Sequence, residues 1–328
     1  MNRRQSIFRV ALTIAATTVT GFDAWAAEKY PVDRVTLVVP YSPGNGLDLL
    51  GREYARALQP LLGASVIVEN REGAAGVIGT SMVARTKPDG ATLLFTAHPP
   101  FATAPVAVDN PPYNPIESFA PIARVASAPL ALVTSSNSPI KSVDDLKSYA
   151  KANPGGASYA SAGPGSPGQL YGELLGQALG VALQEVPYKA TGQALTDVIA
   201  GNVLVSLVSV TAAAQHVASG SLRVLAVGSR QRMKEYANVP TLAEATGRAD
   251  FQAGVWYGFF APAGASRELI DRLNRDIVSA SASAPINEFL SRSMMIPDLQ
   301  DPAQFAASLA KDLDIAKTLA RNAKLKGR

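Results

Sequence analysis

The sequence of 328 residues contains no cysteine, and that absence excludes disulfide bonds, thiolate metal sites and a cysteine nucleophile. Histidine is nearly absent as well, because only His98 and His216 occur, and these two do not have the spacing of a metal-binding pair. No G-x-S-x-G motif of a serine hydrolase is present. Hydrolases and metal-dependent enzymes are therefore disfavoured.

Charged residues are also scarce, at 17% of the chain, whereas hydrophobic residues make up 47% and provide for a large core. The formal net charge is only +4, which argues against nucleic acid and against a membrane surface as partners. A chain of 328 residues is long enough for two domains. Composition thus favours a soluble protein of two domains.

The first 26 residues have the three-part layout of a bacterial export signal. A basic start, MNRRQSIFR, precedes the moderately apolar run VALTIAATTVTGF and an A-x-A cleavage site at Ala24 to Ala26. This run is too short and too rich in threonine for a membrane span. Cleavage after Ala26 removes three arginines and one aspartate, which leaves a formal charge of +2. We predict a signal peptide at residues 1–26 and a periplasmic mature protein.

Strand-like and helix-like segments alternate along most of the chain. Apolar strands are predicted at residues 35–39, 64–70 and 91–97, with helical periodicity between them. A proline-rich passage at residues 98–115 interrupts this alternation, which resumes in the second half of the chain. Apolar strands separated by helices predict parallel sheets that are covered on both faces.

The second half contains a helix with well-defined ends, VDDLKSYAKA. Ser142 is placed to cap its N-terminus, Asp145 stands at the third helical position, and Asn153-Pro154-Gly155 ends it. A late strand is predicted at residues 255–262, and three amphipathic helices finish the chain.

Two stretches of the sequence resemble each other. VVPYSPGNGLDLL and YASAGPGSPGQLYGELL each run from a strand through a turn of serine, glycine and proline into a helix. This similarity predicts two α/β lobes that each present a glycine-rich loop between a strand and a helix. Open parallel sheets bind ligands beyond the carboxyl ends of their strands, where such loops lie.

The second loop matches the dinucleotide motif G-x-G-x-x-G at Gly163, Gly165 and Gly168. If this loop bound a dinucleotide, the protein would be an exported α/β enzyme, such as a nicotinamide-dependent dehydrogenase, and this is the alternative to a binding protein. However, the following strand closes on Tyr188-Lys189 and not on the acid that a ribose requires. Glycines let backbone amides approach an anion, and a helix N-terminus favours negative charge, so a carboxylate fits this loop as well as a phosphate does.

Several single residues have two interpretations. His98 follows the strand at 91–97 and is either a solvated loop residue or a ligand contact. Lys189 either contacts an anion or lies on the surface. His216 is predicted to be structural, and Trp256 and Tyr257 to belong to the core.

Six stretches, in order, resemble one family of proteins. They are VVPYSPGNGLD, VENREGAAGVIGT, YASAGPGSPGQLYGELL, VPYKATGQALTDVIAG, LAVGSRQRMKEYANVPTLAEATG and VWYGFFAPAG. From about Tyr30 to the C-terminus, the chain is similar to the Bug (TctC-type) periplasmic solute-binding proteins of tripartite tricarboxylate transporters.

This resemblance implies an α/β, two-lobed periplasmic binding protein of type II, the Venus flytrap. Each lobe would be a mostly parallel sheet flanked by helices, and two chain crossings would form the hinge. The family holds a small carboxylate between its two glycine-rich loops through backbone amides, hydroxyl groups and water. The corresponding residues of this sequence are Tyr41, Ser42, Pro43, Gly44, Asp48, Ser161, Gly163, Gly165, Ser166, Gln169, Tyr188 and Lys189.

The sequence departs from the family pattern at four positions. Asn45 replaces a glycine of the first loop, and Gln169 replaces a common histidine of the second. Leu204 and Ser209 stand where acids often occur. Because those acids would partner a ligand amine, we expect a mono- or dicarboxylate, aliphatic or aromatic, without an ammonium group.

The resemblance also bears on organisation and partners. The proline-rich break and the late strand place lobe 1 at residues 28–127 and 252–328 and lobe 2 at residues 128–251, with the hinge near Ser127 and Phe251. We expect a monomer that delivers its ligand to the membrane subunits of a transporter. It would use no cofactor or metal and carry out no chemistry.

Overall fold

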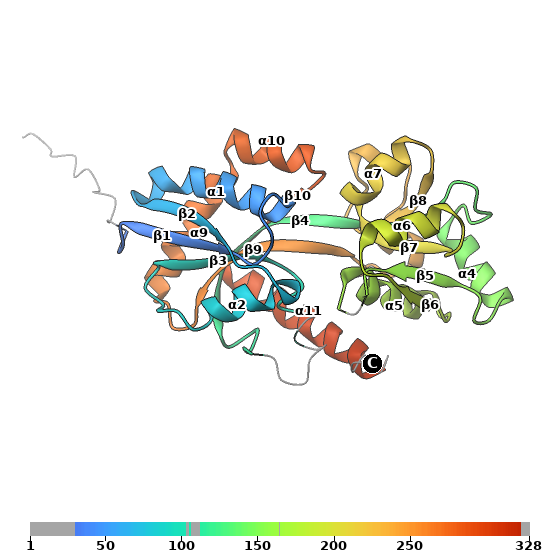
Figure 1. Ribbon diagram of the computed structural model, residues 1–328, viewed down its shortest axis with the longest axis horizontal. Helices are drawn as coiled ribbons and strands as arrows, with labels where there is room; N and C mark the ends of the chain where they lie inside the picture. Colours follow the sequence, from blue (N-terminus) through green and yellow to red (C-terminus); the bar gives the residue numbers. More distant parts are fainter. Residues whose placement is uncertain (1–29, 103–104, 106–111, 164, 323–328) are drawn as a thin grey trace, which may run out of the picture.

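The computed structural model describes residues 30–102, 105, 112–163 and 165–322, so the predicted signal peptide lies outside the described residues. Two α/β bodies stand side by side and are connected by two long strands, β4 and β9 (Figure 1). The body that contains β1 is called lobe 1, and the body that contains β5 is called lobe 2. The fold therefore has the predicted two lobes and two crossings.

Lobe 1 is built from both ends of the chain. Its elements are β1 (Arg34–Val39), α1 (Gly46–Leu62), β2 (Ser65–Asn70), η1 (Ala74–Gly76), α2 (Val77–Val83), β3 (Thr92–Ala97), the first part of β4 (Phe119–Ser135), β9 (Gly254–Pro262), α9 (Arg267–Ser281), α10 (Ala284–Arg292), β10 (Ile296–Gln300) and α11 (Pro302–Asn322).

Lobe 2 is built from the middle of the chain. Its elements are the second part of β4, α4 (Val143–Ala152), β5 (Ser158–Ser161), α5 (Pro167–Leu179), β6 (Gln184–Pro187), α6 (Thr191–Ile199), β7 (Val205–Ser209), α7 (Val210–Ala218), β8 (Leu222–Val227), η2 (Lys234–Tyr236) and α8 (Leu242–Thr246).

The two lobes share one strand order. In lobe 1 the order is β2-β1-β3-β9-β4, with β10 also paired with β4, and in lobe 2 it is β6-β5-β7-β4, with β8 also paired with β4. In each lobe, two successive strand–helix–strand units place the first strand between the other two. The loop after β1 and the loop after β5 therefore occupy equivalent positions, as the internal similarity of the sequence predicts.

The sheets are mixed, and the prediction of mostly parallel sheets was wrong in this detail. Among the described strands, β1 pairs in parallel with β2 and β3, and β5 pairs in parallel with β6 and β7. The pairs that involve β4, β8, β9 and β10 are antiparallel. The reason is that β4 and β9 run in opposite directions between the lobes and pair with each other from Phe119 to Pro129 of β4.

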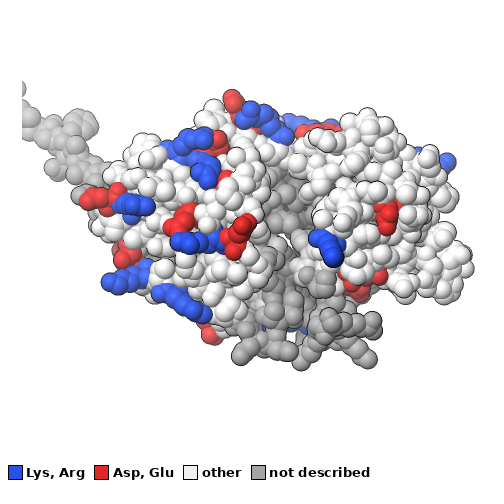
Figure 2. All heavy atoms as spheres, viewed as in Figure 1, with Lys and Arg blue, Asp and Glu red and all other residues white. Residues whose placement is uncertain are grey.

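The strand directions turn the carboxyl-terminal edges of the parallel strands of the two lobes toward each other. The strand β4 runs from lobe 1 into lobe 2. Because β3 and β4 are both antiparallel to β9, the parallel strands of lobe 1 also point toward lobe 2. Because β7 is antiparallel to β4, the parallel strands of lobe 2 point toward lobe 1. The carboxyl ends of both sets face the space between the lobes, where Figure 2 shows a depression in the surface.

Local sequence signals account for many of the helix ends. The Ser142 hydroxyl accepts a hydrogen bond from the Asp145 amide at the start of α4, as predicted, and α4 ends at Ala152 before Asn153. The three predicted C-terminal helices are α9, α10 and α11. Among the described residues, no helix is long and apolar enough to cross a membrane.

The core of lobe 1 contains the aromatic residues of β9. Trp256 is 2% exposed and packs edge to face on Phe305 of α11, which confirms its prediction as a core residue. Phe259 stacks on Phe95 of β3, and Phe260 stacks on Phe101. These contacts pack β3, β9 and α11 together in the core of lobe 1.

The lobes also touch outside the two crossings. The Tyr171 hydroxyl of α5 donates to the Gly254 carbonyl at 3.2 Å, and α5 packs against α11 of lobe 1. The Thr211 hydroxyl of α7 donates to the Ser293 carbonyl, which follows α10, at 2.7 Å. These contacts hold the lobes at their present angle.

Candidate functional site

The first glycine-rich loop connects β1 to α1 and has a backbone that requires glycine. Gly44 has a φ of +81°, a conformation that residues with a side chain rarely adopt. Asn45 caps α1: its side chain accepts from the Asp48 amide at 2.9 Å and donates to the Ser42 carbonyl at 2.6 Å. The departure from glycine at position 45 therefore supplies a helix cap.

Asp48 lies beneath this loop and holds it in place. Its carboxylate is 1% exposed and accepts from the Gly44 amide at 2.8 Å, from Arg52 at 3.0 Å and from Asn70 at 2.9 Å. Burial by itself would raise the pKa of Asp48, but the hydrogen bonds from Arg52, Gly44 and Asn70 outweigh it and lower the pKa. Asp48 is thus ionised and stabilises the loop, and both of its carboxylate oxygens accept hydrogen bonds from residues of lobe 1.

The second loop connects β5 to α5 and repeats this arrangement. Gly163 and Gly165 have φ values of +88° and +75°. Ser166 caps α5 by accepting from the Gln169 amide at 3.2 Å, and Pro167 follows at the start of the helix. The Gly165 amide donates to the Gln169 side chain at 2.8 Å. Gly165, Ser166 and Gln169 therefore correspond to Gly44, Asn45 and Asp48.

The amides of Gly165 and Ser166 are not free to bind a ligand. The Gly165 amide is bound by Gln169, and the Ser166 amide donates to the Gly163 carbonyl at 3.1 Å. The positive φ values of Gly163 and Gly165 let the loop fold back on itself, so these amides donate to groups of the loop. The amides of Gly46 and Leu47 in α1 and of Gly168 in α5 have no acceptor among the described residues, as is usual in the first turn of a helix.

Gly168 shows why the second loop ends in a third glycine. A Cβ atom at this position would lie 2.9 Å from the Leu207 carbonyl oxygen of β7. The absence of a side chain thus lets the start of α5 press against β7. The N-terminus of α5 is thereby placed beside the end of β7, where α7 begins.

The other predicted residues of lobe 2 lie at the ends of β6 and β7. Tyr188 donates its hydroxyl to Asp197 at 2.6 Å, and burial, followed by the Asp197 charge, raises the pKa of Tyr188 to about 12. Lys189 is exposed. Ser209 caps α7 by accepting from the Ala212 amide at 3.2 Å.

The hydroxyl groups of the predicted site fall into two sets. Ser42, Ser161 and Tyr188 donate to acids of their own lobes, namely Glu72, Glu185 and Asp197. Within the described part of the chain, Ser166 and Ser209 act only as acceptors for helix amides, which leaves their hydroxyl hydrogens able to bind an anion. Lobe 2 therefore offers two hydroxyl donors, each at the N-terminus of a helix.

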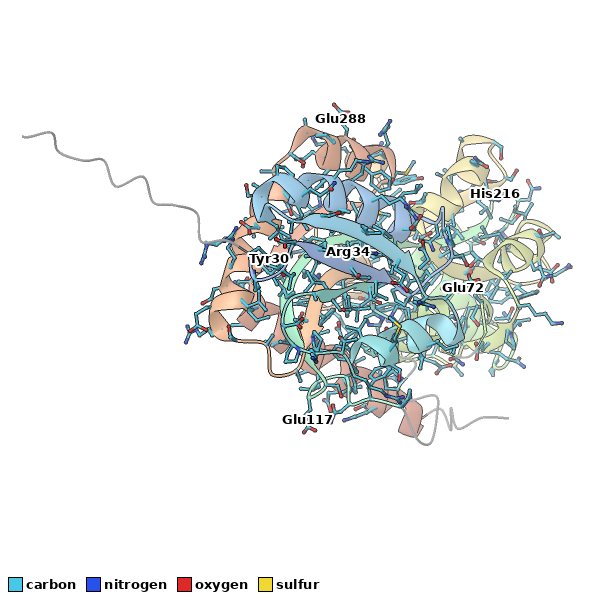
Figure 3. All side chains as sticks on the ribbon, turned by 60° about the vertical axis from the view of Figure 1, so that its left-hand side comes forward. Tyr30, Arg34, Glu72, Glu117, His216 and Glu288 are labelled. Carbon is cyan, nitrogen blue, oxygen red and sulfur yellow. The ribbon has the colours of Figure 1, made fainter. Side chains whose placement is uncertain are left out.

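Sequence reasoning assigned no role to four residues that hold these loops: Arg52, Asn70, Glu72 and Glu185. Asn70 lies within one of the motifs of the family, and that motif was the signal that could have identified it. Glu72 carries a label in Figure 3, at the side of lobe 1 that meets lobe 2.

His98 is buried, so the alternative of a solvated loop histidine was wrong. Its side chain is 1% exposed and packs edge to face on Trp256, with a ring centroid 6.5 Å from that of Tyr171 in α5. Nε2 lies 3.9 Å from an Asp312 oxygen, too far for a hydrogen bond, and Nδ1 has no partner among the described residues. Burial lowers the pKa of His98, Asp312 opposes this and Arg124 adds to it.

This depressed pKa predicts a loss of stability in acid. Unfolding exposes His98, and the unfolded chain then binds a proton at pH values where the folded protein does not. The free energy of unfolding is therefore expected to decrease as the pH falls below about 6.5, by up to about 1.4 kcal/mol per pH unit. Urea unfolding of the protein and of His98→Gln between pH 7.5 and pH 5.5 measures this dependence. Equal slopes in the two proteins would contradict it, and His216→Gln serves as the control.

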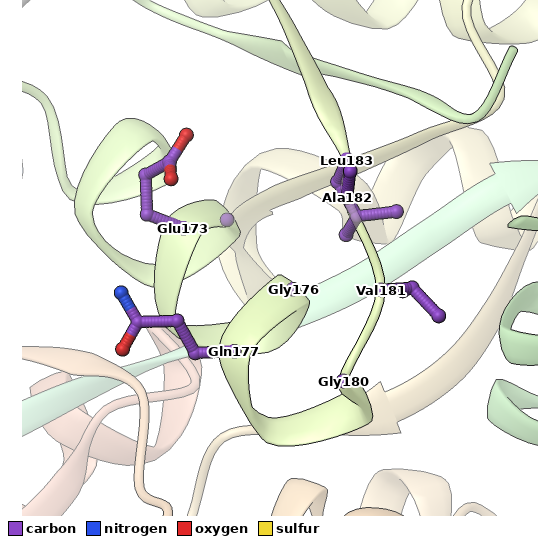
Figure 4. Close-up of a pocket in the computed structure, with 8 residues that line it drawn as sticks. Glu173, Gly176, Gln177, Gly180, Val181, Ala182 and Leu183 are labelled. Atoms are coloured by element: carbon purple, nitrogen blue, oxygen red, sulfur yellow. The ribbon is translucent and has the colours of Figure 1, made fainter. Parts of the chain in front are cut away.

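A hollow in the surface of lobe 2 lies apart from the loops. Figure 4 shows this hollow between the C-terminal part of α5 and the connection to β6. It is lined by Gly172, Glu173, Gly176, Gln177, Gly180, Val181, Ala182 and Leu183, and so by none of the predicted site residues. A search of the described part of the chain for three or more metal-binding side chains in one place finds no such group.

A family model and individual relatives of known sequence indicate the same protein family. The family model described as "Tripartite tricarboxylate transporter family receptor" (TctC) matches residues 50–323. The chain is 35% identical to protein BugT of Bordetella pertussis (strain Tohama I) over 293 residues, which cover 88% of each protein.

Solved structures agree with this result. A TctC solute-binding protein from Polaromonas, solved without ligand, has a TM-score of 0.79 and 28% identity over 90% of this chain and 100% of the other. The structure of R. palustris Rpa4515 with adipate has a TM-score of 0.73 and 29% identity over 90% of this chain and 99% of the other. With its paired glycine-rich loops, two lobes and matched family model, the chain belongs to the TctC family of tripartite tricarboxylate transporter receptors.

Proposed function

We propose that this protein captures a small organic carboxylate in the periplasm, between its two lobes, and delivers it to the membrane subunits of a tripartite tricarboxylate transporter. The observation that carries the proposal is the pair of equivalent loops on facing edges, with Asn45 and Ser166 as matching helix caps. Helix N-termini attract anions, because their first amides lack acceptors and the helix dipole is positive there. A carboxylate has two oxygens and is able to bind one set of amides on each lobe.

The proposed ligand donors combine two hydroxyl groups predicted from the sequence with three backbone amides that the sequence analysis did not name as donors. Gly46, Leu47 and Gly168 supply backbone amides, and the hydroxyl groups of Ser166 and Ser209 supply further donors. The other predicted residues shape or brace the loops. A hydrogen bond to a charged group contributes roughly 1.5–3 kcal/mol, so a few such donors give a useful affinity.

Closure of the lobes completes the proposed site. The hinge lies near Ser127 and Phe251, between lobe 1 at residues 28–127 and 252–328 and lobe 2 at residues 128–251. A ligand drives closure only if it binds the closed state better than the open state, and contacts from both lobes provide that difference. The closed form would present a new surface to the transporter.

The proposed ligand has no ammonium group, because Leu204 and Ser209 replace acids that would bind one. The adipate complex of the R. palustris relative supports a carboxylate ligand of this kind. No catalytic step is proposed, since the residues around the loops bind and position one another and form no arrangement of nucleophile and base.

Native mass spectrometry of the protein isolated from the periplasm of its host is expected to show a retained small carboxylate. Thermal unfolding with added carboxylates is expected to give a higher Tm for those that bind. NAD and aspartate serve as controls that are expected to leave the Tm unchanged. Micromolar binding of NAD, or turnover with it, would instead favour the dehydrogenase, and tight binding of aspartate would contradict the absence of an ammonium group.

A further inference from the structure

The two loops have the same hydrogen-bonding frame but differ in charge. In lobe 1 the residue beneath the loop is Asp48, and its charge is compensated by Arg52 at 3.0 Å. In lobe 2 the equivalent residue is the neutral Gln169, which donates to Glu185 of β6 at 2.9 Å. Among the described residues, Glu185 has hydrogen-bonding partners but no lysine or arginine in an ion pair with it. The side chains beneath the first loop, Asp48 and Arg52, are thus neutral as a pair, whereas Glu185 beneath the second loop carries a negative charge without an ion-pair partner among the described residues.

The carboxylate of Glu185 is held firmly beneath the second loop. The Ser161 hydroxyl donates to one of its oxygens at 2.5 Å, and Gln169 donates to the other. Both donors are buried, at 2% and 5% exposure. Ser161 also accepts from the Gly163 amide at 3.0 Å, so only one side chain separates the acid from the loop backbone.

Of the other charges near the loops, Asp197 of lobe 2 is also partly buried and accepts from Tyr188, whereas the remaining two are exposed and have less influence. Glu72 on lobe 1 and Lys189 on lobe 2 are both exposed and opposite in sign. Water and salt screen exposed charges of this kind. Glu185 is partly buried and is held by two hydrogen-bond donors. Its negative charge is therefore less screened at the second loop than the charges of Glu72 and Lys189.

We propose that Glu185 makes this site selective for ligands with a single negative charge. The inference rests on the proposed function, since it names the class of carboxylate that the same site takes. One carboxylate is accommodated by the amides and hydroxyls of the loops. Glu185 repels each carboxylate of a bound ligand, so a dicarboxylate experiences this repulsion twice and a monocarboxylate only once.

The test compares dicarboxylates with their monoamides, which have the same shape and one charge fewer. Calorimetric titration at pH 7.5 would use succinate, glutarate and adipate, each with its monoamide. We expect the protein to bind the monoamide of the best-fitting length more tightly than the dicarboxylate. Glu185→Gln is expected to improve dicarboxylate binding relative to the monoamide about fivefold, which corresponds to one charge pair under water-like screening.

Glu173→Gln is the matched control. Glu173 is also an acid of lobe 2 and accepts a hydrogen bond from Tyr159, but it lines the hollow of Figure 4. Its replacement is expected to leave the affinity ratio unchanged. In the unmodified protein, raising NaCl from 0.05 M to 0.5 M should shift the ratio toward the dicarboxylate, because salt screens a charge effect and would leave a purely structural one in place.

The outcomes separate the two proposals. Tighter binding of the dicarboxylate, with a ratio that neither salt nor Glu185→Gln changes, would overturn the role of Glu185 and leave the proposed function intact. Failure of all six compounds to bind, together with native protein free of any carboxylate, would overturn the proposed function and this inference with it.

Discussion

Replacing Gly44 with valine is expected to raise the Kd for the carboxylate at least about 100-fold while the fold remains intact. A Cβ atom at Gly44 would meet no described atom within 4 Å, so the expected damage comes from the backbone and not from a clash. A φ of +81° is strained for any residue with a side chain, and most for a β-branched one. We expect the loop to relax, which moves the amides at the start of α1 out of position. A change of 100-fold corresponds to about 2.7 kcal/mol.

The control for this variant is Gly63→Val. Gly63 ends the same helix, has a φ of +65° and also faces open space in the described structure. The substitution therefore imposes a similar strain at the end of α1 that is remote from the loop. It is expected to lower the free energy of unfolding and to leave the Kd near that of the unmodified protein. Equal effects of the two variants on Kd would show that the Gly44 loop has no special part in binding.

Replacing Ser166 with alanine is expected to weaken both the fold and the binding of the ligand. The lost helix cap should lower the free energy of unfolding by about 1 kcal/mol. The lost hydroxyl donor should weaken carboxylate binding by a further ~1.5–3 kcal/mol, which raises the Kd by roughly one to two orders of magnitude. Urea unfolding measures the first effect, and calorimetric titration measures the second.

Ser142→Ala separates these two effects. Ser142 caps α4 of the same lobe through the Asp145 amide at 3.0 Å, and α4 follows the end of β4 that lies away from lobe 1. This variant should lose a similar amount of stability and retain the Kd. An unchanged Kd in Ser166→Ala would remove this hydroxyl group from the binding site.

Local features of the site could be predicted from the sequence because their causes are local. A serine before a proline and a helical pattern predicts the cap at Ser166, and the structure has it. The repeated turn of serine, glycine and proline predicts equivalent loops, because the same short-range constraints act twice. The alternation of strands and helices predicts two α/β lobes for a similar reason.

The features that the sequence could not predict depend on residues far apart along the chain. Asp48 and Asn70 are 22 residues apart, and Ser161 and Glu185 are 24 apart, yet each pair forms a hydrogen bond that orders a loop. The burial of His98 depends on Trp256 and on Tyr171 of the other lobe. The antiparallel strands follow from the path of the chain between the lobes, which periodicity does not reveal.

A crystal structure of the protein with its bound carboxylate tests most directly whether one carboxylate is held between the two glycine-rich loops. We predict electron density for the carboxylate group within hydrogen-bonding distance of the amides at the start of α1 and of the donors at the start of α5. The lobes should also lie closer together than in ligand-free protein. A ligand bound to one lobe alone, or in the hollow between α5 and β6, would contradict the account.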